Sequence, residues 1–161
     1  MPHDAKAVAN VFYKLANNEG KKLTNMQLQK LVYIAHGFNL AVAGEPLFTD
    51  EVHAWEFGPV IPDLYEELKK YGAGEVKARL LTRTPPIKSD NPEMDVINAV
   101  WGSYGKFTGP QLSAMTHKEG TPWSETWKKQ PYGEIRNELI AEHYRKLLDE
   151  QPETSIETVA R

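Results

Sequence analysis

Cysteine is absent from the 161 residues of the sequence. Its absence excludes a disulfide framework, a thiolate nucleophile and a zinc site built on cysteine, and it fits a reducing cytoplasm. The sequence also lacks any apolar run that approaches the ~20 residues needed to cross a bilayer. Its first residues, MPHDAKAV, do not show the basic and then apolar pattern of a signal peptide. We therefore expect a cytoplasmic protein with no membrane partner.

An excess of positive charge is missing as well. The chain carries 19 Lys and Arg residues against 22 Asp and Glu residues, and no basic run is longer than two residues. Proteins that bind nucleic acids usually carry a basic patch. The sequence thus predicts no nucleic-acid partner. The acidity is concentrated in residues 134–161, which hold seven acids and four bases.

Motifs for metal, nucleotide and covalent catalysis are also missing. The histidines at 36, 53, 117 and 143 show neither H-x3-H nor HExxH spacing, and the glycines at 102, 105 and 109 do not form GxGxxG after a strand. Ser113 and Thr116 lie near His117, but no G-x-S-x-G elbow accompanies them. We accordingly predict no catalytic, cofactor-binding or metal-binding residues, and a protein that is not an enzyme.

Length and periodicity predict one α+β domain that is mostly helical. A chain of this length commonly forms a single domain, which we place at residues 1–150. Gln151-Pro152 then breaks the last helix and leaves a polar tail over residues 151–161. The periodicity indicates six or seven helices around a buried central helix, with a small antiparallel sheet of two or three strands.

The central helix has the clearest start in the sequence. Thr24 and Gln27 have the spacing of a capping box, in which each side chain binds the backbone N–H of the other residue. Gly44, with Pro46 just beyond it, predicts where this helix ends. An apolar stripe between these limits predicts the buried face: Leu28, Leu31, Val32, Ala35, Phe38 and Val42.

Two strands and a long last helix complete the expected fold. Residues 52–57, VHAWEF, have the composition of a strand that Gly58-Pro59 stops, and residues 75–82 alternate like a second strand that pairs with the first. The last helix is expected over residues 133–150. Its expected inward face consists of Ile135, Leu139, His143 and Leu147.

Two groups of residues allow both a structural and a functional interpretation. Gln29, Tyr33 and His36 recur along the polar face of the central helix, which is either an ordinary solvated face or a recognition stripe. The aromatic residues of the Trp55–Val60 segment either pack in the core or form a protein-binding hot spot on a rigid turn. His117, in turn, either satisfies carbonyls at a helix end beside Trp123 or takes part in a site.

The sequence resembles the Panacea domain family, which includes the SocA-like antitoxins and the phage-associated GepA proteins. One signature is the run LQKLVYIA at residues 28–35, followed by EPLF at 45–48 and AWEFGPV at 54–60. A second is His117 followed by Pro122-Trp123. The resemblance covers roughly residues 5–145. It implies an antitoxin that binds a cognate protein toxin, encoded by the adjacent gene, and either neutralises it directly or delivers it to an ATP-dependent protease.

We expect the partner to contact both groups of residues together with their neighbours. The alternative is a small enzyme that uses a polar site of Gln29, Tyr33, His36 and His117. The expected partner-binding residues are Gln29, Lys30, Tyr33, His36, Trp55, Phe57, Gly58, Pro59, Val60, His117 and Trp123.

Overall fold

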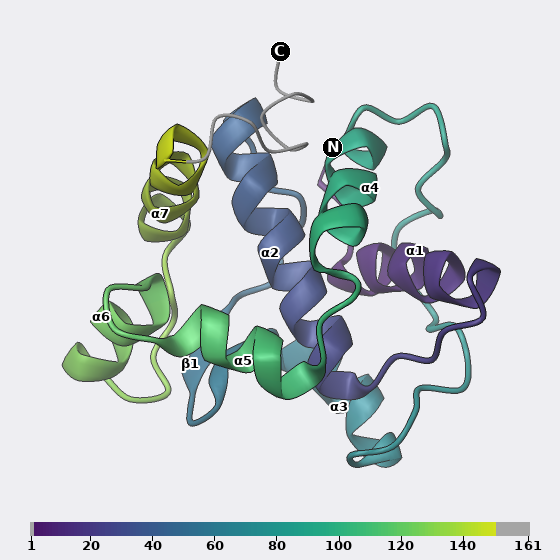
Figure 1. Cartoon of the computed structure of the whole chain (residues 1–161), viewed down its shortest axis with the longest axis horizontal. Coiled ribbons are helices and arrows are strands. Elements are labelled where there is room, and N and C mark those ends of the chain that lie inside the picture. Colours follow the sequence, from purple (N-terminus) through teal and green to yellow (C-terminus); the bar gives the residue numbers. More distant parts are fainter. Residues whose placement is uncertain (1, 151–161) are drawn as a thin grey trace.

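The computed structural model describes residues 2–150, so the predicted polar tail at 151–161 lies outside the described residues. This part of the chain contains seven α-helices, one short 3₁₀ helix and a two-stranded antiparallel sheet, which confirms the predicted α+β, mostly helical class (Figure 1). In chain order the elements are α1 (Ala5–Asn18), α2 (Asn25–Ala43), β1 (His53–Trp55), β2 (Gly58–Val60), α3 (Pro62–Leu68), η1 (Lys69–Tyr71), α4 (Glu93–Tyr104), α5 (Gly109–His117), α6 (Pro122–Lys129) and α7 (Asn137–Glu150).

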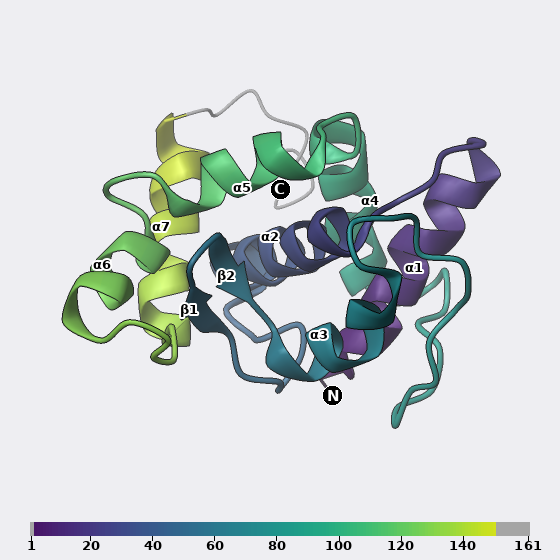
Figure 2. The same ribbon diagram turned by 90° about the horizontal axis from the view of Figure 1, so that it is seen from below.

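Helix α2 is the buried central helix that the sequence predicts. Its capping box is present, because Thr24 Oγ1 accepts from the Gln27 N–H and Gln27 Oε1 accepts from the Thr24 N–H. It ends at Gly44, whose φ of 72° is left-handed and whose N–H donates to the Leu40 carbonyl. Figures 1 and 2 show α2 in the middle, with α6 and α7 on one side and α1 on the other. Because helices α1, α3, α4, α5 and α7 all contact it, α2 is covered on nearly every face.

The sheet is a hairpin, and the predicted strand at residues 75–82 is wrong. Strands β1 and β2 pair with the register His53↔Val60, Ala54↔Pro59 and Trp55↔Gly58. The only ladder contact of residues 75–82 is an isolated bridge between Glu75 and Thr24. The other edge of β1 is already occupied, since residues 132–135 make three backbone hydrogen bonds with residues 52 and 54.

Gly58 and Pro59 form the second strand instead of stopping the first. Gly58 has a φ of 118°, which lets the chain reverse after only two turn residues, Glu56 and Phe57. Pro59 stands opposite Ala54, whose N–H and carbonyl both point the other way, to Gly133 and Tyr132. Pro59 therefore sits at a position where the ladder requires no N–H donor.

The last helix begins later than predicted and buries a different face. Residues 133–136 precede α7, because the Ile135 N–H donates to the Val52 carbonyl at 2.7 Å and holds this segment extended beside β1. The buried residues of α7 are Ile140, Ala141 and Tyr144, while Leu139 and His143 are only half-buried. The expected inward face was thus right only in part: Leu147 packs against the core and Ile135 is buried in the extended segment, but Leu139 and His143 are not among the buried residues. Within residues 2–150, every helix is too short or too polar to cross a membrane.

Candidate partner-binding surface

The β1–β2 hairpin is held by side chains from three helices, and we call these four side chains the hairpin clamp. They bind backbone groups at every second residue from Trp55 to Ile61. The four hydrogen bonds run from Trp123 Nε1 to the Trp55 carbonyl (2.6 Å), from Ser113 Oγ to the Phe57 carbonyl (2.6 Å), from Lys30 Nζ to the Pro59 carbonyl (3.0 Å), and from the Ile61 N–H to Gln29 Oε1 (3.0 Å).

Lys30 is the unusual member of the hairpin clamp. Its side chain is buried at 2% exposure, and within residues 2–150 it has no carboxylate partner. Desolvation lowers the pKa of Lys30 to about 8, because burial disfavours its charged form. Gln29 is buried beside it, and Gln29 Nε2 has no hydrogen-bond partner among the residues that the structure describes. Lys30 Nζ thus binds β2, and Gln29 Oε1 binds the residue that follows β2.

The polar stripe of α2 is not on the surface, so the expectation that Gln29, Tyr33 and His36 are exposed is wrong. All three are buried: the residue after β2 contacts Gln29, α7 contacts Tyr33, and both α7 and residues 47–48 contact His36. Tyr33 packs edge-on against Tyr144 of α7, with ring centroids 6.1 Å apart, and burial raises its pKa. The three polar side chains point at different neighbours and do not form one site.

His36 has a defined protonation state. Its Nδ1 accepts from the Leu47 N–H at 3.2 Å, so its Nε2 carries the proton and donates to Asn137 Oδ1 at 2.9 Å. The ring stacks on Phe48 with centroids 4.0 Å apart. Burial lowers the pKa of His36 to about 4, and the side chain is neutral at physiological pH. His36 therefore connects α2 to the first residue of α7.

His117 serves the end of α5 rather than a reacting group. Its Nδ1 donates to the Ser113 carbonyl one turn earlier, as the structural interpretation of this residue expects. The Ser113 hydroxyl donates to the Phe57 carbonyl and lies 3.4 Å from the His117 ring, so its proton is not directed at a base. Because His36 and Tyr33 point elsewhere, the four-residue polar site of the enzyme alternative is not assembled.

Aromatic side chains flank the hairpin on both sides. Trp55 packs edge-on against Tyr65 of α3 at 5.1 Å. On the other side, Trp123 stacks on Trp127 at 5.4 Å, and Trp127 contacts Tyr132 at 5.2 Å. Tyr132 has a φ of 67°, rare for a residue other than glycine, and it is 56% exposed. Tyr132 is the exposed member of these rings, and Trp55, Tyr65, Trp123 and Trp127 are half-buried.

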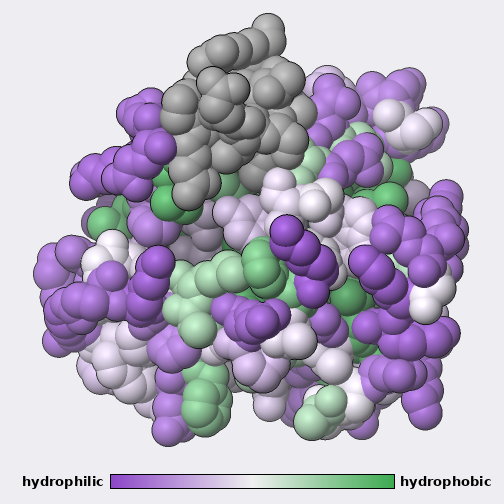
Figure 3. Space-filling view, in the orientation of Figure 1, coloured by the Kyte–Doolittle hydropathy of each residue, from purple (hydrophilic) through white to green (hydrophobic). Residues whose placement is uncertain are grey.

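Phe57, at the tip of the hairpin, is the most exposed of the predicted partner-binding residues. It is 62% exposed, whereas Trp55, His117 and Trp123 are half-buried. Figure 3 shows apolar surface at the lower edge of this face, where the hairpin lies in Figure 1, next to hydrophilic residues. The remaining predicted residues are buried: Gln29, Lys30, Tyr33, His36, Gly58, Pro59 and Val60.

The sequence interpretation missed residues that belong to this surface. Ser113 was considered only as a nucleophile, and its role in binding the hairpin has no local sequence signal. Trp127 had a signal, because it follows Trp123 by four residues and so lies on the same face of a helix. Tyr132 and Tyr65 reach the hairpin only through the tertiary fold.

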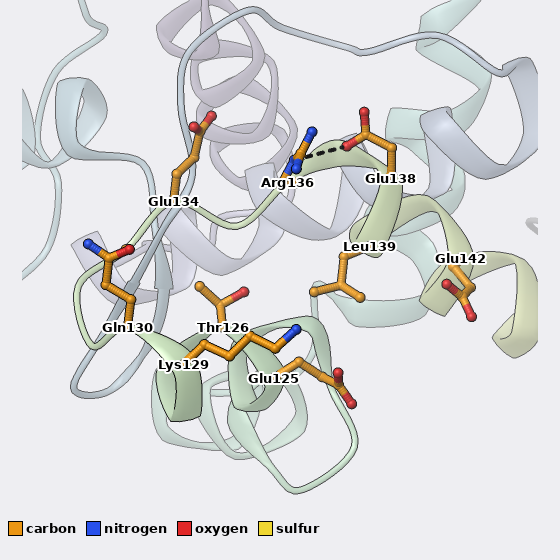
Figure 4. A pocket seen from close by; sticks show the side chains of 10 residues that line it. Glu125, Thr126, Lys129, Gln130, Glu134, Arg136, Glu138, Leu139 and Glu142 are labelled. Atoms are coloured by element: carbon orange, nitrogen blue, oxygen red, sulfur yellow. Dashed lines mark ion pairs between the residues drawn. The ribbon is translucent and has the colours of Figure 1, made fainter.

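An acidic cavity of about 550 Å³ lies between α6 and α7 (Figure 4). Leu139 points from α7 toward α6, and Arg136 pairs with Glu138 at 3.7 Å. Within residues 2–150 no group of side chains has the arrangement of a metal site. The charged residues around the cavity are Glu125, Lys129, Glu134, Arg136, Glu138 and Glu142.

Comparisons with known proteins agree on one family. The family model described as "Antitoxin SocA-like, Panacea domain" matches residues 28–124, a range that contains the hairpin, the hairpin clamp and every predicted partner-binding residue. The chain is also similar to Antitoxin SocA of Caulobacter vibrioides (strain NA1000 / CB15N), with 34% identity over 128 residues that cover 74% of this chain and 68% of that protein. No solved structure matches.

Proposed function

Because this chain belongs to the SocA-like antitoxins of the Panacea domain family, we propose that it neutralises a protein toxin by direct binding in a one-to-one complex. The toxin is a protein encoded by the adjacent gene. Neutralisation follows from occupancy of the toxin by this chain and involves no chemical step.

The observation that carries this proposal is the way in which the matched segment uses its polar residues. Lys30, Ser113 and Trp123 each donate a hydrogen bond to the hairpin backbone. They hold a fixed loop with an aromatic residue at its tip. Tight protein interfaces are dominated by a few rigid aromatic anchors, and a fixed loop loses little conformational entropy on binding.

The predicted partner-binding residues divide by exposure into two roles. Phe57 is exposed and Trp55, His117 and Trp123 are half-buried, so these four reach the surface where a partner can touch them. The buried residues act indirectly. Gln29 and Lys30 hold the hairpin against α2, while Tyr33 and His36 contact α7.

A titration tests the proposal. The product of the adjacent reading frame is expressed and purified, and its toxic activity is measured with increasing amounts of this chain. Inhibition should rise in proportion to complex formation and saturate at one equivalent, with a one-to-one mass by light scattering. An unrelated protein of similar size and charge is the control.

Two outcomes would contradict direct neutralisation. Complete inhibition by a small fraction of an equivalent, with no protease present, would indicate catalysis. Loss of toxin only when an ATP-dependent protease is added, with no inhibition by the one-to-one complex alone, would indicate delivery for degradation.

A further inference from the structure

The hairpin carries one large apolar side chain outward. Phe57 is 62% exposed, and with Leu81 and Tyr132 it is one of three large apolar or aromatic side chains that are well exposed within residues 2–150. Leu81 lies in the irregular segment between η1 and α4. Phe57, in contrast, lies between two paired strands, and its own carbonyl is bound by Ser113 at 2.6 Å.

The backbone beneath Phe57 is fixed at four points. The hairpin clamp binds residues 55, 57, 59 and 61, so the turn cannot rotate Phe57 into the core without breaking these hydrogen bonds. Gly58, the residue after it, lies against the buried Lys30, since a Cβ at position 58 would be 3.2 Å from Lys30 Cε. The exposure of Phe57 is therefore a property of the fold, and its apolar area is available for burial by another molecule.

The hairpin cannot recruit a partner by adding a strand. The outer edge of β2 is occupied by the hairpin clamp, and that of β1 is paired with residues 132–135. Strand addition requires a row of free N–H and carbonyl groups. Contact at the hairpin must therefore be made by side chains, with Phe57 as the projecting group.

We propose that Phe57 is the anchor of the toxin interface and inserts into an apolar pocket on the toxin. This inference rests on the proposed function and names the contact. Glu56 precedes Phe57 in the turn, is exposed, and has no ion-pair partner within residues 2–150. Glu56 is thus free to face a basic side chain beside that pocket, and this electrostatic contact is tested separately below. The half-buried Trp55, at the end of β1, widens the apolar contact.

The test compares matched substitutions of two exposed apolar residues in the full chain. Phe57→Ala and Leu81→Ala are titrated against the purified product of the adjacent reading frame by calorimetry. Phe57→Ala should weaken binding at least 30-fold, about 2 kcal/mol at 1.4 kcal/mol per tenfold change, with a melting temperature within a few degrees of wild type. Leu81→Ala, which removes a side chain that is 93% exposed, should bind within twofold of wild type. Glu56→Gln should slow association at low salt and leave dissociation nearly unchanged.

Each outcome bears on one proposal. If wild type binds and Phe57→Ala binds within threefold, the anchor is wrong while the proposed function stands. If the wild-type chain does not bind the toxin, the proposed function is wrong, and the anchor proposal falls with it. If sedimentation shows that wild type self-associates and Phe57→Ala does not, with equal toxin binding by both, the tip is a contact between copies of this chain, and the anchor is again wrong.

Discussion

The ammonium of Lys30 donates to the carbonyl of Pro59 across 3.0 Å, and so connects the first turns of α2 to the second strand of the hairpin. The contact lies in the interior, since Lys30 is only 2% exposed and Pro59 is buried. A buried lysine without a carboxylate is costly in isolation. The Lys30 side chain lies against Gly58 and therefore supports the hairpin where it packs on the central helix.

Replacing Lys30 by Met should change how stability depends on pH. The pKa of Lys30 is about 8 in the folded chain and ~10.4 for an unperturbed lysine. The unfolded chain therefore binds more protons between these values, and the wild-type free energy of unfolding gains a rising contribution as pH increases through this window. Lys30→Met lacks this contribution. Urea denaturation at pH 7.5 and 9.5 should show the difference between wild type and variant shifting in favour of wild type by roughly 1–2 kcal/mol. Parallel pH profiles for the two proteins would show that Lys30 is not held in a dry site.

Replacing His36 by Gln should flatten the acid side of the stability curve. The pKa of His36 is about 4 in the folded chain and ~6.5 unperturbed, so the unfolded state binds the extra proton as pH falls through 6.5. Wild type should lose roughly 1–2 kcal/mol of stability between pH 7 and pH 5 relative to His36→Gln. Denaturation series at pH 7, 6 and 5 measure this difference. A difference in the free energy of unfolding between the two proteins that stays constant from pH 7 to pH 5 would contradict a neutral, buried imidazole.

Gly37→Ala should destabilise the packing of α2 against α7. A Cβ at position 37 would lie under 3.0 Å from three carbons of the Tyr144 ring, and Tyr144 is itself buried in the core. Overpacking of this kind costs about 1–3 kcal/mol. Gly102→Ala is the control, because it lies in α4 with nothing within 4 Å of the added carbon, and it should gain up to about 1 kcal/mol from helix propensity. Thermal or urea unfolding of both variants checks the pair. Equal stability of the two would show that α7 can move away from α2 without cost.

Trp123→Phe should loosen the hairpin while it keeps most of the packing. The change removes the donor to the Trp55 carbonyl and retains a ring against His117 and Trp127. We expect a stability loss of about 1 kcal/mol and faster amide hydrogen exchange in residues 55–61. Trp127→Phe alters the same stack without touching a hairpin hydrogen bond, so it should leave exchange in the hairpin unchanged. Equally fast exchange in both variants would assign the effect to aromatic packing and not to the clamp.

The sequence alone determined where the central helix begins and ends. The capping box at Thr24 and the glycine cap at Gly44 are both present, because each cap joins groups within four residues of one another. Interactions of this range depend on the local sequence and do not require tertiary contacts. The family and the mostly helical class followed from the same local patterns, and both are confirmed.

The tertiary structure alone decided which residues are accessible. The polar face of α2 resembles a solvated face in the sequence, but Asn137 and Tyr144, about 100 residues further on, arrive to bury His36 and Tyr33. In the same way, residues 132–135 take the edge of β1 that residues 75–82 were expected to fill. Periodicity reports that a face is polar, but it does not report which distant element will supply hydrogen bonds to that face. The position of Phe57 at the surface and of Lys30 beneath it follows from the whole arrangement of α2, α5 and α6 around one hairpin.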